Sequence, residues 1–125
     1  MIELEREFVI SREDLVSYAN ASGDQNPIHQ DQTFALSVGL PGVIAHGMLT
    51  MGLIGSVLTE FAGPASVVDF QVRFTRPVVV DESGAKVIIT VSEKSRENDL
   101  VSVDISATYE GQTVVSKASA LVRLP

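Results

Sequence analysis

The sequence predicts an α+β fold in which one long apolar helix lies against a curved antiparallel sheet. Residues 32–59 contain no Asp, Glu, Lys or Arg, which indicates a helix buried in a core. From residue 68 onward, apolar and polar side chains alternate, as expected for half-buried strands. With a length of 125 residues, we expect residues 1–125 to form a single domain.

The N-terminal region predicts a strand followed by a short helix. Residues 3–9 alternate loosely between polar and apolar side chains, which favours a strand. Ser11 is a suitable N-cap for a helix over 12–21, because two acidic residues follow in its first turn. Gly23 is suited to end that helix, since glycine readily adopts the left-handed conformation of a C-cap.

A second short helix and a long central helix are predicted next. Asp31 is placed to cap a helix that runs to about residue 38. The central helix is expected over 46–62, apolar on nearly all sides and therefore fully buried. Gly52 and Gly55 inside it indicate close approach of another backbone or of a ligand. Four antiparallel strands should follow, near residues 68–74, 85–93, 101–109 and 113–123.

Composition excludes several classes of protein. The net charge of −7 argues against nucleic-acid binding. The apolar stretch is long enough to span a bilayer, but Gly39, Pro41 and Gly42 interrupt it, so we predict no membrane span. The absence of cysteine excludes disulfides and thiolate sites and fits a reducing compartment. The N-terminus lacks the features of a signal peptide, so a cytoplasmic location is expected.

The stretch "SGDQNPIHQD" contains the first candidate functional residues. Pro27 fixes its own backbone and restricts Asn26 to extended conformations, so the loop should be rigid. A rigid loop suits an acid–base pair, and Asp24 and His29 can hold one water molecule between them. Alternatively, Asp24 caps a turn and His29 is a hydrogen-bonded core residue. Spacing leaves both interpretations open.

The stretch "AHGM" supplies a second candidate group. If the central helix begins here, the backbone N–H of Gly47 has no partner within the helix and carries the positive end of the helix dipole. Such a donor can stabilise a developing oxyanion. Alternatively, Gly47 only helps the chain to turn into the helix. We expect His46 to have a structural role, with a hydrogen bond to the loop of Asp24.

Two weaker interpretations concern metals and phosphates. Asp24, His29 and His46 resemble a site with two histidines and one carboxylate, but their spacing lacks a metal motif, and no metal is expected. Basic residues in the C-terminal half could face a phosphate-bearing ligand, although most are expected on solvated strand faces. These residues are Arg73, Arg76, Lys86, Lys94, Arg96 and Lys117.

The motifs "SGDQNPIHQDQTFA" and "LPGVIAHGMLTMG" resemble the signature of the MaoC-like dehydratase and (R)-specific enoyl-CoA hydratase family. The spacing of the D-x-N-P-x-H loop and the H-G-M motif, about 17 residues later, is fairly specific. The resemblance extends over most of the chain, including "FQVRFTRPVVVDE". The chain is also similar to the catalytic subunit of actinobacterial heterodimeric (3R)-hydroxyacyl-ACP dehydratases.

The resemblance implies a hotdog fold, in which a curved antiparallel sheet wraps a long helix, and usually a homodimer. A heterodimer with a related subunit is the alternative. It implies a hydro-lyase that reversibly hydrates trans-2-enoyl thioesters of CoA or acyl carrier protein to (3R)-hydroxyacyl thioesters, without a cofactor. Asp24 and His29 would be the catalytic pair and Gly47 the oxyanion donor. From the residues themselves, we expect Asn26, Pro27 and His46 to support this site.

One departure from the family and two alternative functions remain. Some family members carry a serine nine residues after the histidine of H-G-M, but this chain has Gly55 there and Ser56 next. The resemblance therefore assigns no role to a serine. The alternatives are an acyl-CoA thioesterase and a non-catalytic acyl-binding subunit. Release of free thiol would identify the first, and binding without turnover the second.

Overall fold

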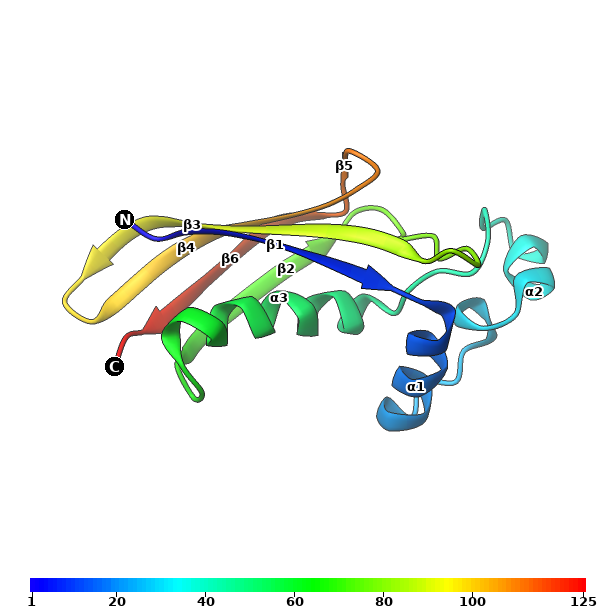
Figure 1. Ribbon diagram of the computed structural model, residues 1–125, viewed down its shortest axis with the longest axis horizontal. Coiled ribbons are helices and arrows are strands. Elements are labelled where there is room, and N and C mark those ends of the chain that lie inside the picture. The colour runs from blue at the N-terminus through cyan, green and yellow to red at the C-terminus, as the bar shows by residue number, and fades with distance from the viewer.

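The computed structural model describes residues 1–125 as a sheet with one long helix against it and short helices at one end (Figure 1). The strands are β1 (Glu3–Ile10), β2 (Val67–Phe74), β3 (Ala85–Glu97), β4 (Leu100–Tyr109), β5 (Gln112–Thr113) and β6 (Val115–Arg123). The helices are α1 (Arg12–Ser22), the 3-10 helix η1 (Pro27–His29), α2 (Gln32–Ser37) and α3 (Gly47–Ala62).

The sheet is antiparallel throughout and has the order β1-β3-β4-β6-β2, with β5 paired to β4. β3 continues to Glu97, beyond the predicted end, because its hairpin with β4 stays paired up to Glu97 and Leu100. Two turns of the sheet contain residues with left-handed backbone: Asn98 has a φ of 58° and Glu110 a φ of 51°. The turn at Asn98 joins β3 to β4 and the turn at Glu110 joins β4 to β5, so they set the register of these two hairpins.

Local signals place α1 and α2 where the sequence predicted them. The side chain of Ser11 accepts a hydrogen bond from the backbone of Asp14, and the Asp14 carboxylate accepts one from the Ser11 N–H, which completes a capping box. Gly23 ends α1 with a φ of 82°. Asp31 caps α2 through a bond from the Phe34 N–H. None of the helices combines the length and apolarity needed to cross a membrane.

α3 packs on one face of the sheet and begins at the end where α1 and α2 lie (Figure 1). Its inner face contributes Ile54, Val57 and Leu58 to the main hydrophobic core. The expectation of a fully buried helix is wrong for the single chain: Met48 is 59% exposed, and a Cβ at Gly52 would meet no atom within 4 Å. The sheet covers only one side of the helix.

β2 also differs from the predicted half-buried strand. It is the outer strand next to β6, and Val68 is 52% exposed and Phe74 47% exposed. Gly55 of α3 lies near it, since a Cβ there would be 3.7 Å from the ring of Phe70. Apolar residues on β2 therefore remain uncovered, because no further strand or helix of this chain packs beyond that edge.

Candidate active site

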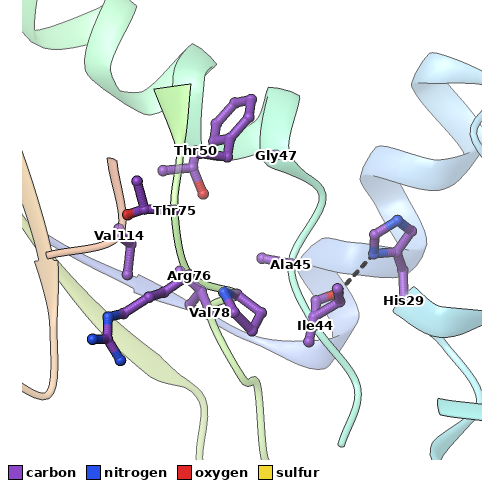
Figure 2. Close-up of a pocket in the computed structure, with 11 residues that line it drawn as sticks. His29, Ile44, Ala45, Gly47, Thr50, Thr75, Arg76, Val78 and Val114 are labelled. Atoms are coloured by element: carbon purple, nitrogen blue, oxygen red, sulfur yellow. Dashed lines mark hydrogen bonds between the residues drawn. The ribbon is translucent and has the colours of Figure 1, made fainter. Parts of the chain in front are cut away.

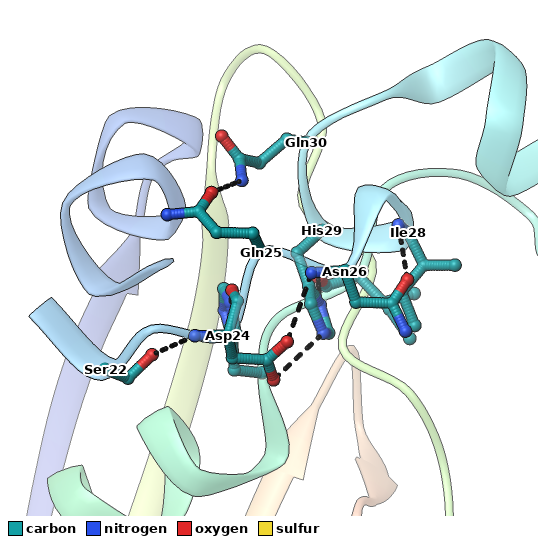
Figure 3. A network of polar contacts seen from close by, with 9 residues as sticks. Ser22, Asp24, Gln25, Asn26, Ile28, His29 and Gln30 are labelled. Atoms are coloured by element: carbon teal, nitrogen blue, oxygen red, sulfur yellow. Dashed lines mark hydrogen bonds and ion pairs between the residues drawn. The ribbon is translucent and has the colours of Figure 1, made fainter. Parts of the chain in front are cut away.

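The loop that follows α1 is shaped by its own short polar side chains (Figure 3). Ser22 Oγ accepts from the N–H of Asp24 at 3.1 Å, and Asp24 Oδ1 accepts from the N–H of Asn26 at 3.2 Å. Asn26 Oδ1 in turn accepts from the N–H of Ile28 at 3.2 Å and caps η1, which begins at Pro27. These local bonds constrain the backbone of the loop that the sequence predicts to be rigid. They also leave Asp24 Oδ2 without a backbone partner.

His29 is held so that one ring nitrogen is bonded and the other is open. Its side chain is buried, and Nδ1 lies 2.7 Å from the carbonyl oxygen of Ile44. A carbonyl can only accept, so Nδ1 carries the proton in neutral His29 and Nε2 carries the lone pair. Nε2 faces Asp24 Oδ2 at 3.9 Å (Figure 3). A water oxygen about 2.8 Å from each of these two acceptor atoms fits between them.

His46 lies against both members of this pair. Its Nε2 lies 3.2 Å from the backbone oxygen of Asp24, and its ring stacks on that of His29 with centroids 3.7 Å apart and planes 20° apart. Only 2% of its surface is exposed, and this burial lowers the pKa of His46, against the raising effect of the bond to Asp24. Burial therefore favours the neutral form of the His46 ring.

Gly47, the first residue of α3, lies on a cavity of about 420 Å³ that also reaches His29 (Figure 2). As the first N–H of a helix, that of Gly47 has no acceptor within α3, and it makes no other hydrogen bond in the chain. A Cβ at this position would lie 3.1 Å from the ring of Phe74. The lining residues are His29, Ile44, Ala45, Gly47, Thr50, Phe74, Thr75, Arg76, Pro77, Val78 and Val114.

The structure thus brings Asp24, His29, His46 and Gly47 together, and it adds residues that the sequence analysis missed. Ile44 orients His29 through its backbone oxygen, which no side-chain motif could reveal. Thr50 and Phe74 line the cavity, although their positions in sequence predicted only core or strand residues.

Among the basic residues considered from sequence, Arg76 is the one that lines the cavity. Its guanidinium bonds to Gln112, and no carboxylate lies within ion-pair distance. Lys86 and Arg96 instead pair with neighbouring glutamates on the strands, as expected for solvated faces. Ser56 is exposed and does not line the cavity, and its hydroxyl donates to the Leu53 carbonyl within α3.

The geometry does not suit a metal ion shared by the two histidines. One ligand atom from each of Asp24, His29 and His46 lies within 4.8 Å of the others. However, an imidazole lone pair points along the plane of its ring. The two rings are stacked nearly parallel, so an ion in the plane of one ring would lie well outside the plane of the other. The site fits proton transfer better than metal binding.

Comparison with known proteins identifies the family. The profile of the MaoC-like domain matches residues 1–112. The 3-hydroxybutyryl-CoA dehydratase of Methylorubrum extorquens is 36% identical over 118 residues, which cover 93% of this chain and 74% of that protein. The (R)-specific enoyl-CoA hydratase of Rhodospirillum rubrum is 31% identical over 118 residues, which cover 93% of this chain and 81% of that protein.

Solved structures agree. A MaoC-like dehydratase superposes with a TM-score of 0.95 at 37% identity, covering 99% of this chain, which spans only 40% of that protein. An (R)-hydratase from A. caviae involved in PHA biosynthesis gives a TM-score of 0.89 at 25% identity, covering 99% of this chain and 95% of that one. The hotdog fold implied by the sequence motifs is confirmed, and the chain belongs to the MaoC-like domain family.

Proposed function

We propose that this protein catalyses the reversible hydration of trans-2-enoyl thioesters to (3R)-hydroxyacyl thioesters. The observation that carries the proposal is the facing pair of free acceptor atoms, Asp24 Oδ2 and His29 Nε2, 3.9 Å apart beside the cavity. The names of the dehydratase and hydratase relatives, which the chain covers for most of their length, agree with this reaction.

In the proposed mechanism, Asp24 and His29 bind one water molecule through its two hydrogens. The water oxygen attacks C3 of the enoyl group while the pair accepts one of its protons. The pair then delivers a proton to C2 on the same face, so that water has added across the double bond. The N–H of Gly47 binds the thioester oxygen, where negative charge develops as C3 is attacked. The reaction needs only water and the thioester, and no cofactor.

The direct test is turnover of crotonyl-CoA by the purified protein, followed as loss of enoyl-thioester absorbance with the product configuration determined. We expect (3R)-hydroxybutyryl-CoA without release of free thiol. Asp24→Asn should fold normally and lose about 10²-fold or more in rate, because an amide cannot accept the proton of the water. Full turnover by folded Asp24→Asn would contradict the assignment. Thiol release would identify a thioesterase, and binding without turnover an acyl-binding subunit.

Arg76 is the proposed contact for the phosphate-bearing carrier arm of the thioester. Its guanidinium and His29 lie on different sides of the same cavity (Figure 2). The chain has a net charge of −7, so an arginine without an acidic partner at this cavity is a specific attraction for an anionic substrate.

The role of Arg76 can be separated from catalysis by steady-state kinetics. We expect Arg76→Gln to raise KM for crotonyl-CoA about fivefold with little change in kcat, since an exposed charge contributes about 1 kcal/mol. Lys94→Gln removes the same charge from an exposed site on β3 that does not line the cavity and serves as the control. Equal KM values for the two variants would remove the carrier contact from the proposal.

A homodimer formed through β2 is also part of the proposal. β2 forms one edge of the sheet with Val67, Val68 and Phe74 exposed, whereas the acidic side chains on β1 protect the opposite edge from pairing. A second copy at β2 would cover these residues and the open side of α3, and it would narrow the cavity beside Phe74.

Sedimentation velocity of two matched variants tests this interface. Val68→Lys places a charge on the β2 edge and should yield monomers, whereas Val9→Lys changes a valine on β1 that is slightly more exposed and should leave the dimer intact. A monomeric wild type would rule out the homodimer, and a stable complex only with a second, related chain would replace it with a heterodimer.

The expected cytoplasmic location remains a prediction, which cell fractionation can check.

A further inference from the structure

His46 connects the two halves of the site, although it does not line the cavity. Through Nε2 it holds the backbone oxygen of Asp24 at 3.2 Å, and through its ring face it contacts His29 at a centroid distance of 3.7 Å. The next residue in the chain is Gly47, which lines the cavity and whose N–H makes no hydrogen bond in the chain. One side chain therefore links the acid–base pair to the start of α3.

No other hydrogen bond attaches Asp24 to a part of the chain distant in sequence. The hydrogen bonds of Ser22, Asp24 and Asn26 join residues only two positions apart, so they shape the loop without attaching it to the rest of the protein. Asp24 itself is exposed, with 52% of its side chain accessible, and packing does not hold it. The contact with His46, 22 positions away, is the long-range hydrogen bond that fixes this part of the loop.

The surroundings of His46 select one tautomer. Because the Asp24 carbonyl only accepts, Nε2 carries the proton. Nδ1 is buried and has no hydrogen-bond partner, so a second proton there would be left without an acceptor. The groups that face the ring are Tyr18 of α1, with a centroid 4.8 Å away, the Asp24 backbone and His29 of η1. The ring thus acts as a neutral spacer.

We infer that His46 is a positioning residue for the proposed hydration, one that keeps Asp24 Oδ2 and His29 Nε2 at the separation one water molecule can bridge. This inference rests on the proposed function of the same pair. His46 is not a catalytic residue, because it contacts the backbone of Asp24 and the ring of His29 and does not line the cavity in which the substrate would react.

Two variants separate the two contacts. His46→Phe retains a ring that can stack on His29 and loses the donor to Asp24, whereas His46→Gln retains a donor and loses the ring. We expect each to fold and to lower kcat by about 10²-fold, because a displacement of about 1 Å in a reacting group has an effect of that size. KM for crotonyl-CoA should change little. Ser56→Ala, on an exposed part of α3, is the control that should keep wild-type kcat.

A second measurement reports position without turnover. The chain has two histidines, so each variant leaves His29 as the only one, and its NMR titration is unambiguous. We expect the midpoint of His29 to move in both variants and the pH profile of kcat/KM to move with it. Wild-type kcat in folded variants would overturn the inference. So would loss of activity with an unchanged His29 midpoint and pH profile, which would indicate a merely structural role.

Failure of the proposed function would be recognised separately. If the wild-type protein does not turn over crotonyl-CoA, the hydration proposal fails, whereas the NMR titration still decides whether His46 positions His29. An unchanged midpoint in both folded variants would then overturn the positioning role by itself.

Discussion

The Nδ1 atom of His29 donates a hydrogen bond of 2.7 Å to the backbone oxygen of Ile44, 15 positions further along the chain. The backbone bond from the Ile44 N–H to the Ile28 oxygen lies beside it at 3.2 Å. Together they fix the ring of His29 so that Nε2, and not Nδ1, faces Asp24. The Ile44 carbonyl therefore selects the tautomer of His29 whose Nε2 can accept a proton. The backbone bond between Ile44 and Ile28 holds that carbonyl in place.

Two substitutions of His29 should separate chemistry from anchoring. His29→Asn can keep a donor near the Nδ1 position, so it should retain the bond to Ile44 and the fold but lose about 10²–10⁴-fold in kcat, since Nε2 is gone. His29→Gln misplaces the donor, and we expect it to cost about 1–3 kcal/mol of stability in addition. Steady-state kinetics and urea unfolding measure the two effects. Equal stability of both variants would contradict the anchoring role of Ile44.

Gly47 should tolerate no side chain without loss of activity. In Gly47→Ala the new Cβ would lie 3.1 Å from the ring of Phe74, so the ring or the start of α3 must shift. We expect kcat/KM for crotonyl-CoA to fall about 10²-fold, because the N–H would no longer point at the thioester oxygen. Adding Phe74→Leu makes room for the methyl group and should restore part of the loss. No recovery in the double variant would show that the contact with Phe74 is not the cause.

Stability should depend on pH through His46. Burial lowers its pKa in the folded state below the unfolded value, so on acidification the unfolded chain takes up a proton before the folded protein does. The contribution is fully present above the ordinary histidine pKa and is lost as the pH falls from there toward the folded value. Melting temperatures should therefore drop more between pH 7 and pH 5 for the wild type than for His46→Phe. If the melting temperatures of the wild type and of His46→Phe fall by the same amount, the pKa of His46 does not differ between the folded and unfolded states.

The core beneath α3 should dominate stability. Leu58 is fully buried, and Leu58→Ala should lower the free energy of unfolding by about 2–5 kcal/mol, because it leaves a cavity. Ser56→Ala on the exposed face of the same helix should change it by less than about 0.5 kcal/mol. Urea unfolding measures both, and a single cooperative transition would support the prediction that residues 1–125 form one domain. If Leu58→Ala and Ser56→Ala lowered the free energy of unfolding by similar amounts, the face of α3 that contains Leu58 would not be the one that forms the core.

Features determined by neighbours in the chain could be predicted from the sequence. The caps at Ser11 and Gly23 and the strand periods fall where local patterns placed them. The local shape of the site loop also follows from residues two positions apart, Asp24 with Asn26 and Asn26 with Ile28. The physical cause of the Ser11 cap and of the loop bonds is short-range: a side-chain oxygen reaches a backbone N–H two or three positions away in the chain.

Only the tertiary structure decided which distant groups meet. The bond of His29 to Ile44, the stack of His46 on His29 and the approach of Phe74 to Gly47 join segments that no local period relates. The sequence also led to a wrong expectation for α3, because an apolar surface on all sides does not indicate which side the sheet covers. Hydrophobic burial is non-directional, so it drives α3 onto the sheet without specifying the contacts. The packing of the whole chain selects them, and with them the geometry of the site.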